Sequence, residues 1–202
     1  MNHIVYADLR DFTSHSDALF AAATPERQQR ATGCREDVAL RCLVSGALLA
    51  YAAKQEGISA YTVAENPFGK PFLETHPDFH FNLTHAGHYA AIVWGQSPVG
   101  IDLEVPRHRD TITKLAKRHF TPAEQEYAAD TARFYEIWTA KESYLKFLGT
   151  GINRPLDSFC TRSPEIRALL HPFFPEEDCC LTVCAEDSCA TPVRVAPGDL
   201  LK

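Results

Sequence analysis

The chain has 202 residues, of which 45% are hydrophobic and 23% are charged, and its formal net charge is −6. A chain of this composition can bury a substantial core, so extensive disorder is excluded, and the length suits one domain or two fused smaller ones. The negative charge excludes a surface built as a whole for nucleic acid, and any anionic partner must therefore meet a local basic patch.

The sequence shows no targeting signal and no zinc-type cysteine pair. It does not open with a basic region followed by an apolar run, and no apolar stretch is long enough to span a bilayer. Its seven cysteines contain no C-x-x-C pair. We therefore predict a cytoplasmic protein with no membrane partner. The cysteines in residues 179–189 are expected to be buried thiols, with a metal-binding or redox-sensing cluster as the alternative.

Helical patterns dominate the first part of the chain. Thr24 has the character of a helix N-cap, because proline follows it at the first helical position. Residues 35–56 then predict one long helix that ends at Gly57. The positions expected to be buried on this helix include Val38, Leu43, Leu48 and Leu49.

The pattern changes to short strands after residue 58. Up to residue 104, short apolar runs alternate with turn residues, which predicts a strand meander. The candidate strands are residues 79–85, 88–94 and 98–105. A polar joint is expected at residues 106–110, so the chain divides there into an N-terminal half, 1–105, and a C-terminal half, 106–202.

The second half returns to helix and then to strand. A basic amphipathic segment lies near residues 112–119, and a capping box begins at Thr121. The strongest helix runs over residues 132–148, and short strands are expected at residues 157–161 and 180–185. The two halves therefore share the order helix then strands, which predicts an α/β (α+β) fold made of two similar parts.

Two carboxylates share one face of the strand predicted at residues 98–105. Side chains alternate along a strand, so Asp102 and Glu104 point one way and lie roughly 6–7 Å apart along it. Like charges at this spacing repel unless a cation lies between them. Hard oxygen ligands suit Mg²⁺, whose remaining positions are filled by water and substrate phosphates. A solvated strand face is the alternative interpretation.

A lysine interrupts the apolar stripe of the strongest helix. Lys141 falls near the middle of this stripe, with Glu142 at its border and Lys146 one turn further on the same side. A lysine in a core stripe is unfavourable unless it meets an anion. The alternative is a snorkelling lysine beside a stabilising Glu–Lys pair at i,i+4 spacing. The stripe itself consists of Phe134, Ile137, Trp138, Leu145 and Leu148.

Two further candidate groups lie beside turns. His85 ends an apolar run immediately before a tight turn, and Lys70 lies in a loop stiffened by prolines and a glycine. Such a loop can aim a lysine at a phosphate, although an ordinary turn and a structural histidine explain the same residues.

Four short motifs occur in a fixed order along the chain: GKP at residues 69–71, FNLTH at 81–85, GIDLE at 100–104 and WTAKESYLK at 138–146. Together they resemble the signature of the Sfp-type 4'-phosphopantetheinyl transferases, and the similarity extends over residues 24–159. The resemblance implies two pseudo-symmetric halves, each a helix packed on a small, mainly antiparallel sheet. It also implies a monomer that binds coenzyme A between the halves, at the active site.

The resemblance implies an enzyme. Its reaction would be the Mg²⁺-dependent transfer of the 4'-phosphopantetheine group of coenzyme A to a serine of an apo acyl or peptidyl carrier protein, with release of 3',5'-ADP. By position, the magnesium ligands would be Asp102, Glu104 and Glu142, consistent with an ion that holds a diphosphate. Lys141 and Lys146 would contact that diphosphate and stabilise the transition state. The serine proton would pass to Glu142 or to a magnesium-bound hydroxide, which the sequence does not separate.

The remaining coenzyme A contacts that the resemblance implies are cationic or polar side chains. His85 would hold the 3'-phosphate. The others are Arg27, Arg30, Arg41, Lys70 and Thr84, together with Lys141. Two positions depart from the family pattern, since Thr84 stands where serine is commoner and Cys42 stands where some members have threonine.

An acidic carrier helix would need a positive landing site. The dense basic stretch adjoins the metal-binding strand, so local charge there opposes the negative total. The residues expected to dock the carrier are Arg107, Arg109, Lys114, Lys117 and Arg118. After residue 159 the chain is short and carries several prolines, which predicts a reduced second sheet.

Two rival functions remain on the sequence alone. One is a non-catalytic coenzyme A or nucleotide-binding protein that retains the same fold. Binding alone does not need Asp102, Glu104, Glu142 and Lys146 together, which speaks against it. The other is a different Mg²⁺-dependent phosphotransferase, for which the chain shows no G-x-x-x-x-G-K-[ST] loop.

Overall fold

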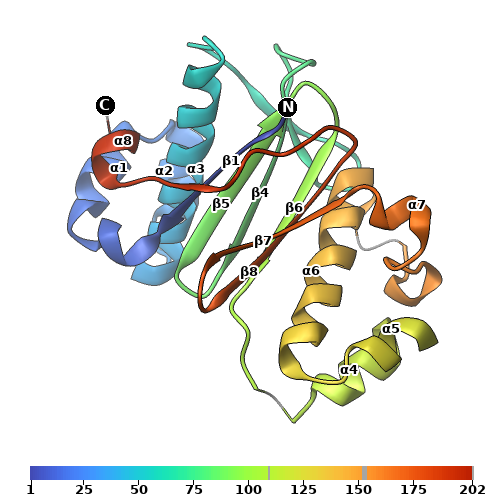
Figure 1. Cartoon of the computed structure of the whole chain (residues 1–202). Helices are drawn as coiled ribbons and strands as arrows, with labels where there is room; N and C mark the ends of the chain where they lie inside the picture. Colours follow the sequence, from blue (N-terminus) through green and yellow to red (C-terminus); the bar gives the residue numbers. More distant parts are fainter. Residues whose placement is uncertain (109, 152–153, 202) are drawn as a thin grey trace.

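The computed structural model describes residues 1–108, 110–151 and 154–201 (Figure 1). Its strands are β1 His3–Asp8, β2 Val63–Glu65, β3 Pro71–Leu73, β4 His80–Ala86, β5 Tyr89–Gly95, β6 Val99–Glu104, β7 Leu170–Glu176, β8 Cys179–Ala185 and β9 Val193–Arg194. Its helices are η1 Leu9–His15, α1 Ser16–Ala22, α2 Pro25–Ala31, α3 Glu36–Gln55, α4 Ile112–His119, α5 Pro122–Tyr127, α6 Thr131–Leu148, η3 Leu156–Ser158, α7 Pro164–Arg167 and α8 Pro197–Leu200.

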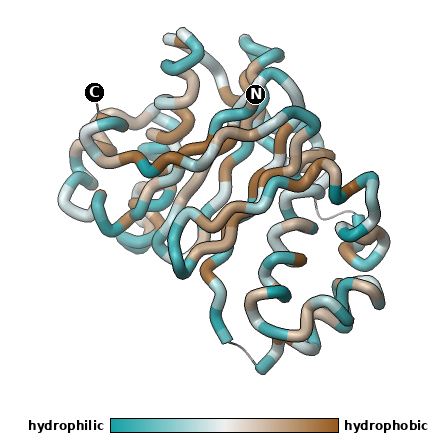
Figure 2. Tube along the Cα trace, in the orientation of Figure 1, coloured by the Kyte–Doolittle hydropathy of each residue, from teal (hydrophilic) through white to brown (hydrophobic). Residues whose placement is uncertain are grey.

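The main strands form two sheets whose inner faces pack on each other. The first has the order β4-β5-β1-β9 and the second the order β6-β8-β7, while β2 and β3 form a separate pair. Strand β5 is antiparallel to both β4 and β1, and the second sheet is antiparallel throughout. A shared core of Ile4, Tyr6, Ile101, Leu103 and Val183 fills the space between the sheets, and Figure 2 shows the hydrophobic tubes gathered there.

One long helix covers the outer face of each sheet, so the layers run helix, sheet, sheet, helix (Figure 1). Helix α3 packs on β1 and β5, and its Leu43, Leu48 and Leu49 are buried against that sheet. The prediction of a buried Val38 was wrong, because this residue near the start of α3 is 41% exposed.

Helix α6 has defined ends and lies directly on β6 and β8. The carboxylate of Asp130 caps its first turn by accepting from the backbone amide of Arg133 at 2.8 Å. At the other end Gly149 adopts a left-handed φ of 66°, which glycine tolerates without strain. Gly100 of β6 allows the close approach, because a Cβ atom there would overlap the carbonyl oxygen of Ser143 and the amide nitrogen of Phe147.

The predicted α/β class, with helices on small, mainly antiparallel sheets, is confirmed. The three strands of the meander and the two long helices lie where they were expected. The strand predicted at residues 157–161 was wrong, because a short 3-10 helix, Leu156–Ser158, begins this segment. Leu148 was expected in the apolar stripe of α6 but is 37% exposed.

The second sheet contains a strand, β7, that was not predicted from the sequence because the segment carries prolines. Strand β7 pairs with β8 only, and Pro172 and Pro175 are tolerated in it because it is an edge strand. The division predicted after residue 105 separates β6 from β8 and β7, with which it forms a sheet. Strand β9, from the C-terminal half, joins the first sheet by pairing in parallel with β1.

No helix in the described part of the chain is both long and apolar enough to cross a lipid bilayer. Cys179, Cys180 and Cys184 are buried in β8, and burial raises the pKa of each thiol. These three side chains pack within the second sheet, in agreement with the expectation of buried thiols.

Candidate active site

Asp102 and Lys146 form the centre of the candidate site. The ammonium nitrogen of Lys146 lies 2.6 Å from Oδ1 of Asp102 and also donates to the carbonyl oxygen of Ile101 at 3.0 Å. Asp102 lies on strand β6, whereas Lys146 lies in the last turn of helix α6. The contact therefore depends on the close packing of α6 on β6 that Gly100 permits.

Asp102 is a buried carboxylate that is not fully satisfied. It is 6% exposed, and burial raises its pKa even though the charge of Lys146 opposes that shift. Its second oxygen, Oδ2, is buried without a hydrogen-bond partner among the described residues. A buried carboxylate oxygen in this state is unfavourable, so the site has capacity for a further cation or hydrogen-bond donor.

Strand β4 supplies the other wall of the site. The hydroxyl of Thr84 lies 3.4 Å from both Oδ1 of Asp102 and the Lys146 nitrogen. Two residues earlier, Oδ1 of Asn82 accepts a hydrogen bond of 2.9 Å from the backbone amide of Ile101, which joins the edges of the two sheets. The substitution of threonine for serine at residue 84 thus retains a hydroxyl beside the carboxylate.

Glu142 lies on the same side of α6 as Lys146 and borders a cavity. Burial and the charge of Asp102 both raise its pKa, and the charge of Lys146 opposes them, so the three groups share one electrostatic environment. The cavity has a volume of about 330 Å³, and Arg118 and Arg154 also line it. It is large enough to admit part of a substrate next to the Glu142 carboxylate.

Glu104 lies on the same face of β6 as Asp102. The residues opposite them in β8, Cys180 and Thr182, both contact Thr139 of α6, so this face of the sheet points towards the helix. Glu104 is partly buried. Within residues 1–108, 110–151 and 154–201, however, no three Asp, Glu, His or Cys side chains converge closely enough to hold a metal ion.

The donor set nevertheless fits a magnesium ion in part. Asp102 offers one unsatisfied buried oxygen, and Glu142 is near enough for the charge of Asp102 to raise the pKa of Glu142. Mg²⁺ commonly takes only one or two protein carboxylates and completes its shell with water and substrate phosphates. A complete protein cage is therefore not required for the ion expected here.

Lys141 is paired elsewhere in this structure, and its predicted contact with the diphosphate stays a prediction. Its side chain is fully buried on the opposite side of α6, where its nitrogen lies 2.8 Å from a carboxylate oxygen of Glu124. It also donates to the carbonyl oxygens of Leu156 and Phe159, each at 2.7 Å. The anion that the buried lysine requires is thus a carboxylate of helix α5.

Glu124 completes this buried network. Its carboxylate accepts from the amide and hydroxyl of Thr121 and from those of Thr161. Burial acts to raise the pKa of Glu124, but the hydrogen bonds from Lys141 and Thr161 together outweigh it and lower the pKa below its usual value. The pair therefore ties α5 and the segment around residues 156–161 to α6.

Lys70 is likewise placed away from an anion. Its nitrogen donates to the backbone carbonyl oxygens of Lys146 at 2.6 Å, Val99 at 2.8 Å and Phe147 at 3.5 Å. Burial lowers its pKa to about 8. The contact between Lys70 and coenzyme A stays a prediction, and in this structure its ammonium group is occupied by the end of α6 and the start of β6.

His85 of β4 and Arg41 of α3, both predicted to contact coenzyme A, lie near enough to each other for the charge of Arg41 to affect His85. His85 as a whole residue is exposed, but partial desolvation of its ring and the charges of Arg41 and Lys146 lower its pKa. The Nε atom of Arg41, on α3, is buried without a hydrogen-bond partner among the described residues. Positive groups thus gather beside Thr84 and would favour an anion there.

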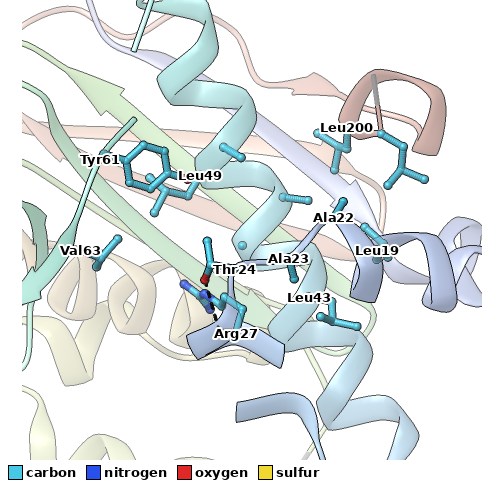
Figure 3. A pocket seen from close by; sticks show the side chains of 14 residues that line it. Leu19, Ala22, Ala23, Thr24, Arg27, Leu43, Leu49, Tyr61, Val63 and Leu200 are labelled. Atoms are coloured by element: carbon cyan, nitrogen blue, oxygen red, sulfur yellow. Dashed lines mark hydrogen bonds between the residues drawn. The ribbon is translucent and has the colours of Figure 1, made fainter. Parts of the chain in front are cut away.

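Arg27 and Arg30 lie on α2, at one side of this group. The guanidinium of Arg27 donates to the carbonyl oxygen of Cys42 at 3.4 Å, and Arg30 pairs with Glu65 at 3.6 Å. Figure 3 shows Arg27 and Thr24 at the edge of an otherwise mainly apolar cavity. With a volume of about 100 Å³, this cavity is too small for a nucleotide.

The basic residues of α4 form an exposed surface next to the Glu142 cavity. Lys114, Lys117 and Arg118 are exposed on this helix, and Arg107 is exposed just before it. Arg118 also lines the cavity, so the surface and the cavity are continuous. Arg109, which was predicted with this group, lies outside the described residues.

Several residues that build the site were not predicted from the sequence. Asn82 and Gly100 belong to recognised motifs, but their structural roles were not assigned. Glu124 was noted only as part of a capping box, and Arg154 was not considered. The signal for Glu124 was present, since a lysine predicted in an apolar stripe demands a carboxylate somewhere in the fold.

Comparisons with known proteins point to one family. A family model described as the 4'-phosphopantetheinyl transferase superfamily matches residues 98–190. A 4'-phosphopantetheinyl transferase of Bacillus subtilis is 33% identical over 174 residues, which covers 78% of this chain and 74% of the relative. The transferase Sfp of Bacillus subtilis strain 168 is 36% identical over 101 residues, covering 47% of this chain and 44% of that protein.

A third relative, the 4'-phosphopantetheinyl transferase gsp of Aneurinibacillus migulanus, is 36% identical over 101 residues, with coverage of 47% of this chain and 41% of the relative. The alignments with Sfp and gsp thus span less than half of each of those proteins.

Proposed function

This chain belongs to the 4'-phosphopantetheinyl transferase superfamily, and we propose that it transfers the 4'-phosphopantetheine group of coenzyme A to a serine of an apo acyl or peptidyl carrier protein. The reaction would depend on Mg²⁺ and release 3',5'-ADP. The observation that carries this proposal is the convergence of Asp102 from β6 with Glu142 and Lys146 from α6, beside a cavity bordered by basic residues.

Asp102 and Glu142 would hold the magnesium ion, with Glu104 on the same strand face as a third ligand. The unsatisfied Oδ2 atom of Asp102 supports this assignment, as does the charge of Asp102, which raises the pKa of Glu142. When bound, the ion supplies positive charge against the diphosphate of coenzyme A. The other contributions below come from side chains of this chain.

Lys146 would stabilise the charge that develops during transfer. In the absence of substrate its ammonium group is paired with Asp102. A diphosphate bound beside Asp102 would offer the same ammonium a second anionic partner, and positioned cations act most strongly where charge develops. Lys146 would then face the oxygen that leaves with 3',5'-ADP.

The transfer step requires an attacking serine and a base. The serine oxygen forms a bond to the phosphorus that carries pantetheine, the bond from that phosphorus to the oxygen of the departing 3',5'-ADP breaks, and the serine proton moves to a base. Glu142 suits this role because it borders the cavity of about 330 Å³ and its pKa is raised by burial and by Asp102.

The nucleotide end of coenzyme A would lie against the positive groups near β4. His85, Thr84 and the unpartnered Nε of Arg41 are the residues best placed for its phosphates. Arg27 and Arg30 remain proposed contacts on α2, and both would have to leave their present partners.

The exposed basic surface of α4 would dock the acidic carrier. Arg118 supports this placement, because it belongs both to that surface and to the lining of the Glu142 cavity. A carrier held by Arg107, Lys114 and Lys117 would then present its serine near Glu142. Arg109 lies outside the described residues, and its part in docking stays a prediction.

The direct test is the mass of a carrier after reaction. An apo carrier incubated with the protein, coenzyme A and Mg²⁺ should gain about 340 Da, the mass of the phosphopantetheine group. A parallel sample in EDTA should gain nothing. If acyl, peptidyl and aryl carriers all keep their mass while coenzyme A binds, the protein is a binder and not a transferase.

A further inference from the structure

The ammonium group of Lys70 is fully used inside the protein. It has three N–H donors, and the structure supplies three acceptors: the carbonyl oxygens of Lys146, Val99 and Phe147, at 2.6, 2.8 and 3.5 Å. No donor remains for a phosphate while these contacts persist. Because burial lowers the pKa of Lys70 to about 8, the group is also enclosed rather than solvated.

The acceptors identify what Lys70 does for the fold. The last carbonyl groups of a helix have no partner within the helix, and a cation at that end also opposes the helix dipole. Lys146 and Phe147 are in the last turn of α6, whereas Val99 begins β6. A single ammonium group therefore joins the end of α6 to the start of β6.

The conformation of the loop that carries Lys70 is fixed by hydrogen bonds and by a glycine turn. The side-chain oxygen of Asn66 accepts from the backbone amides of Phe68 and Lys70, each at 2.9 Å, and its amide nitrogen donates to the carbonyl oxygen of Gly149 at 2.9 Å. Gly69 closes the turn with a φ of 82°. Asn66 and Lys70 thus hold the end of α6 through three carbonyl groups, and Lys70 also binds the carbonyl group of Val99 in β6.

This clamp acts on a residue of the reaction centre. Lys70 binds the backbone of Lys146, while the side chain of Lys146 reaches Asp102 at 2.6 Å. Displacement of the last turn of α6 would move the Lys146 ammonium away from β6. A shift of about 1 Å at a catalytic group can lower a rate by about a hundredfold.

We propose that Lys70 is a positioning residue for the transfer reaction, which fixes Lys146 against β6 through the last turn of α6 and does not bind the coenzyme phosphates. The proposal rests on the proposed function. It assigns the G-K-P loop, which lies in the N-terminal part of the chain, to the support of a catalytic helix in the C-terminal part.

The experiment compares Lys70→Met with wild type in three measurements. These are the affinity for 3',5'-ADP by calorimetry, the kcat and KM for carrier modification, and the hydrogen exchange of the backbone amides at residues 146–149. We expect the Kd for 3',5'-ADP to change by less than about twofold, kcat to fall about tenfold or more, and amide exchange to accelerate. Lys70→Gln should recover part of kcat, because its amide keeps two donors.

The double variant Lys70→Met, Lys146→Met separates positioning from a general loss of structure. If Lys70 acts through Lys146, adding Lys70→Met to Lys146→Met should lower kcat by less than about twofold further. Lys54→Met, at an exposed lysine in the last turn of α3, is the matched control and should leave all three measurements unchanged.

Two outcomes would overturn the proposal. One is a Kd for 3',5'-ADP that rises about tenfold in Lys70→Met while kcat and amide exchange stay constant, which is the behaviour of a phosphate ligand. The other is a Lys70→Met protein that matches wild type in every measurement. If wild type modifies no carrier at all, the transfer function fails, whereas faster exchange at residues 146–149 in Lys70→Met would still report the clamp.

Discussion

The nitrogen of Lys146 lies 2.6 Å from a carboxylate oxygen of Asp102, and this ion pair joins α6 to β6 at the candidate active site. Asp102 is almost completely buried, whereas the side chain of Lys146 is 29% exposed. The lysine is therefore the partner that can turn towards an entering anion. If Lys146 turns towards an entering anion, the carboxylate of Asp102 becomes free to bind a cation at the same site.

Replacement of Lys146 by methionine should abolish most of the transfer activity while leaving the protein folded. The variant removes the cation proposed to face the departing 3',5'-ADP, and loss of one such group typically lowers kcat by about a hundredfold or more. Intact-mass kinetics with a saturating carrier would measure this. A kcat within about twofold of wild type would mean that Lys146 only balances the charge of Asp102.

Asp102→Asn and Glu142→Gln should each lose most activity and most of the Mg²⁺ dependence of coenzyme A binding. Both substitutions retain shape but remove a negative oxygen that a divalent cation needs. Circular dichroism and the melting temperature would verify folding, and titration of coenzyme A with and without Mg²⁺ would measure the dependence. Either variant turning over at the wild-type rate, or wild type turning over in EDTA, would remove the ion from the mechanism.

The position of the catalytic strand and helix followed from local patterns. Alternating apolar residues and turn residues predicted β4, β5 and β6 to within about two residues, and the stripe and glycine stop predicted α6. Strand β7 was not predicted because Pro172 and Pro175 argue against a strand. The order of the sheet shows that both prolines lie in an edge strand, where they are tolerated.

The partners of the two buried lysines could not be predicted in the same way. The position of Lys141 in an apolar stripe required an anion, and the anion expected was the coenzyme diphosphate. The fold instead brings Glu124 to it from α5. Lys70 likewise meets backbone carbonyl groups rather than a phosphate. Sequence spacing identifies a charge that needs a partner, but the choice of partner depends on tertiary packing.

The buried Glu124–Lys141 pair should make stability depend on pH in the acid range. Because the pKa of Glu124 is lowered in the fold from its ordinary value of 4.5, the stability it contributes is present above that value and is lost as pH falls through the lowered pKa. Glu124→Gln should reduce the free energy of unfolding at neutral pH by about 3–5 kcal/mol, because it leaves Lys141 buried without its anion.

Urea unfolding of wild type and Glu124→Gln at a series of pH values from neutral to acid would measure this. The two curves should approach each other below the ordinary pKa. Glu126→Gln, at an exposed glutamate of the same helix, is the control and should follow wild type. Curves for wild type and Glu124→Gln that stay parallel throughout would show that the carboxylate does not change its proton affinity on folding.

Reversal of charge on α4 should impair carrier docking selectively. The double variant Lys114→Glu, Lys117→Glu changes two exposed residues of the basic surface and leaves Arg118 in the cavity lining. We expect the KM for the carrier to rise about tenfold and the KM for coenzyme A to change by less than about twofold, with a smaller difference at high salt. The opposite ranking of the two KM values would place the docking surface elsewhere.

The most direct test of the central claim is a crystal structure with coenzyme A and Mn²⁺, which occupies oxygen sites similar to those of Mg²⁺ and can be located by its anomalous signal. We predict an anomalous peak in contact with carboxylate oxygens of Asp102 and Glu142, and the Lys146 nitrogen within hydrogen-bond distance of the diphosphate. A peak elsewhere, or coenzyme A bound while the Asp102–Lys146 pair stays intact and no ion lies beside it, would contradict this account.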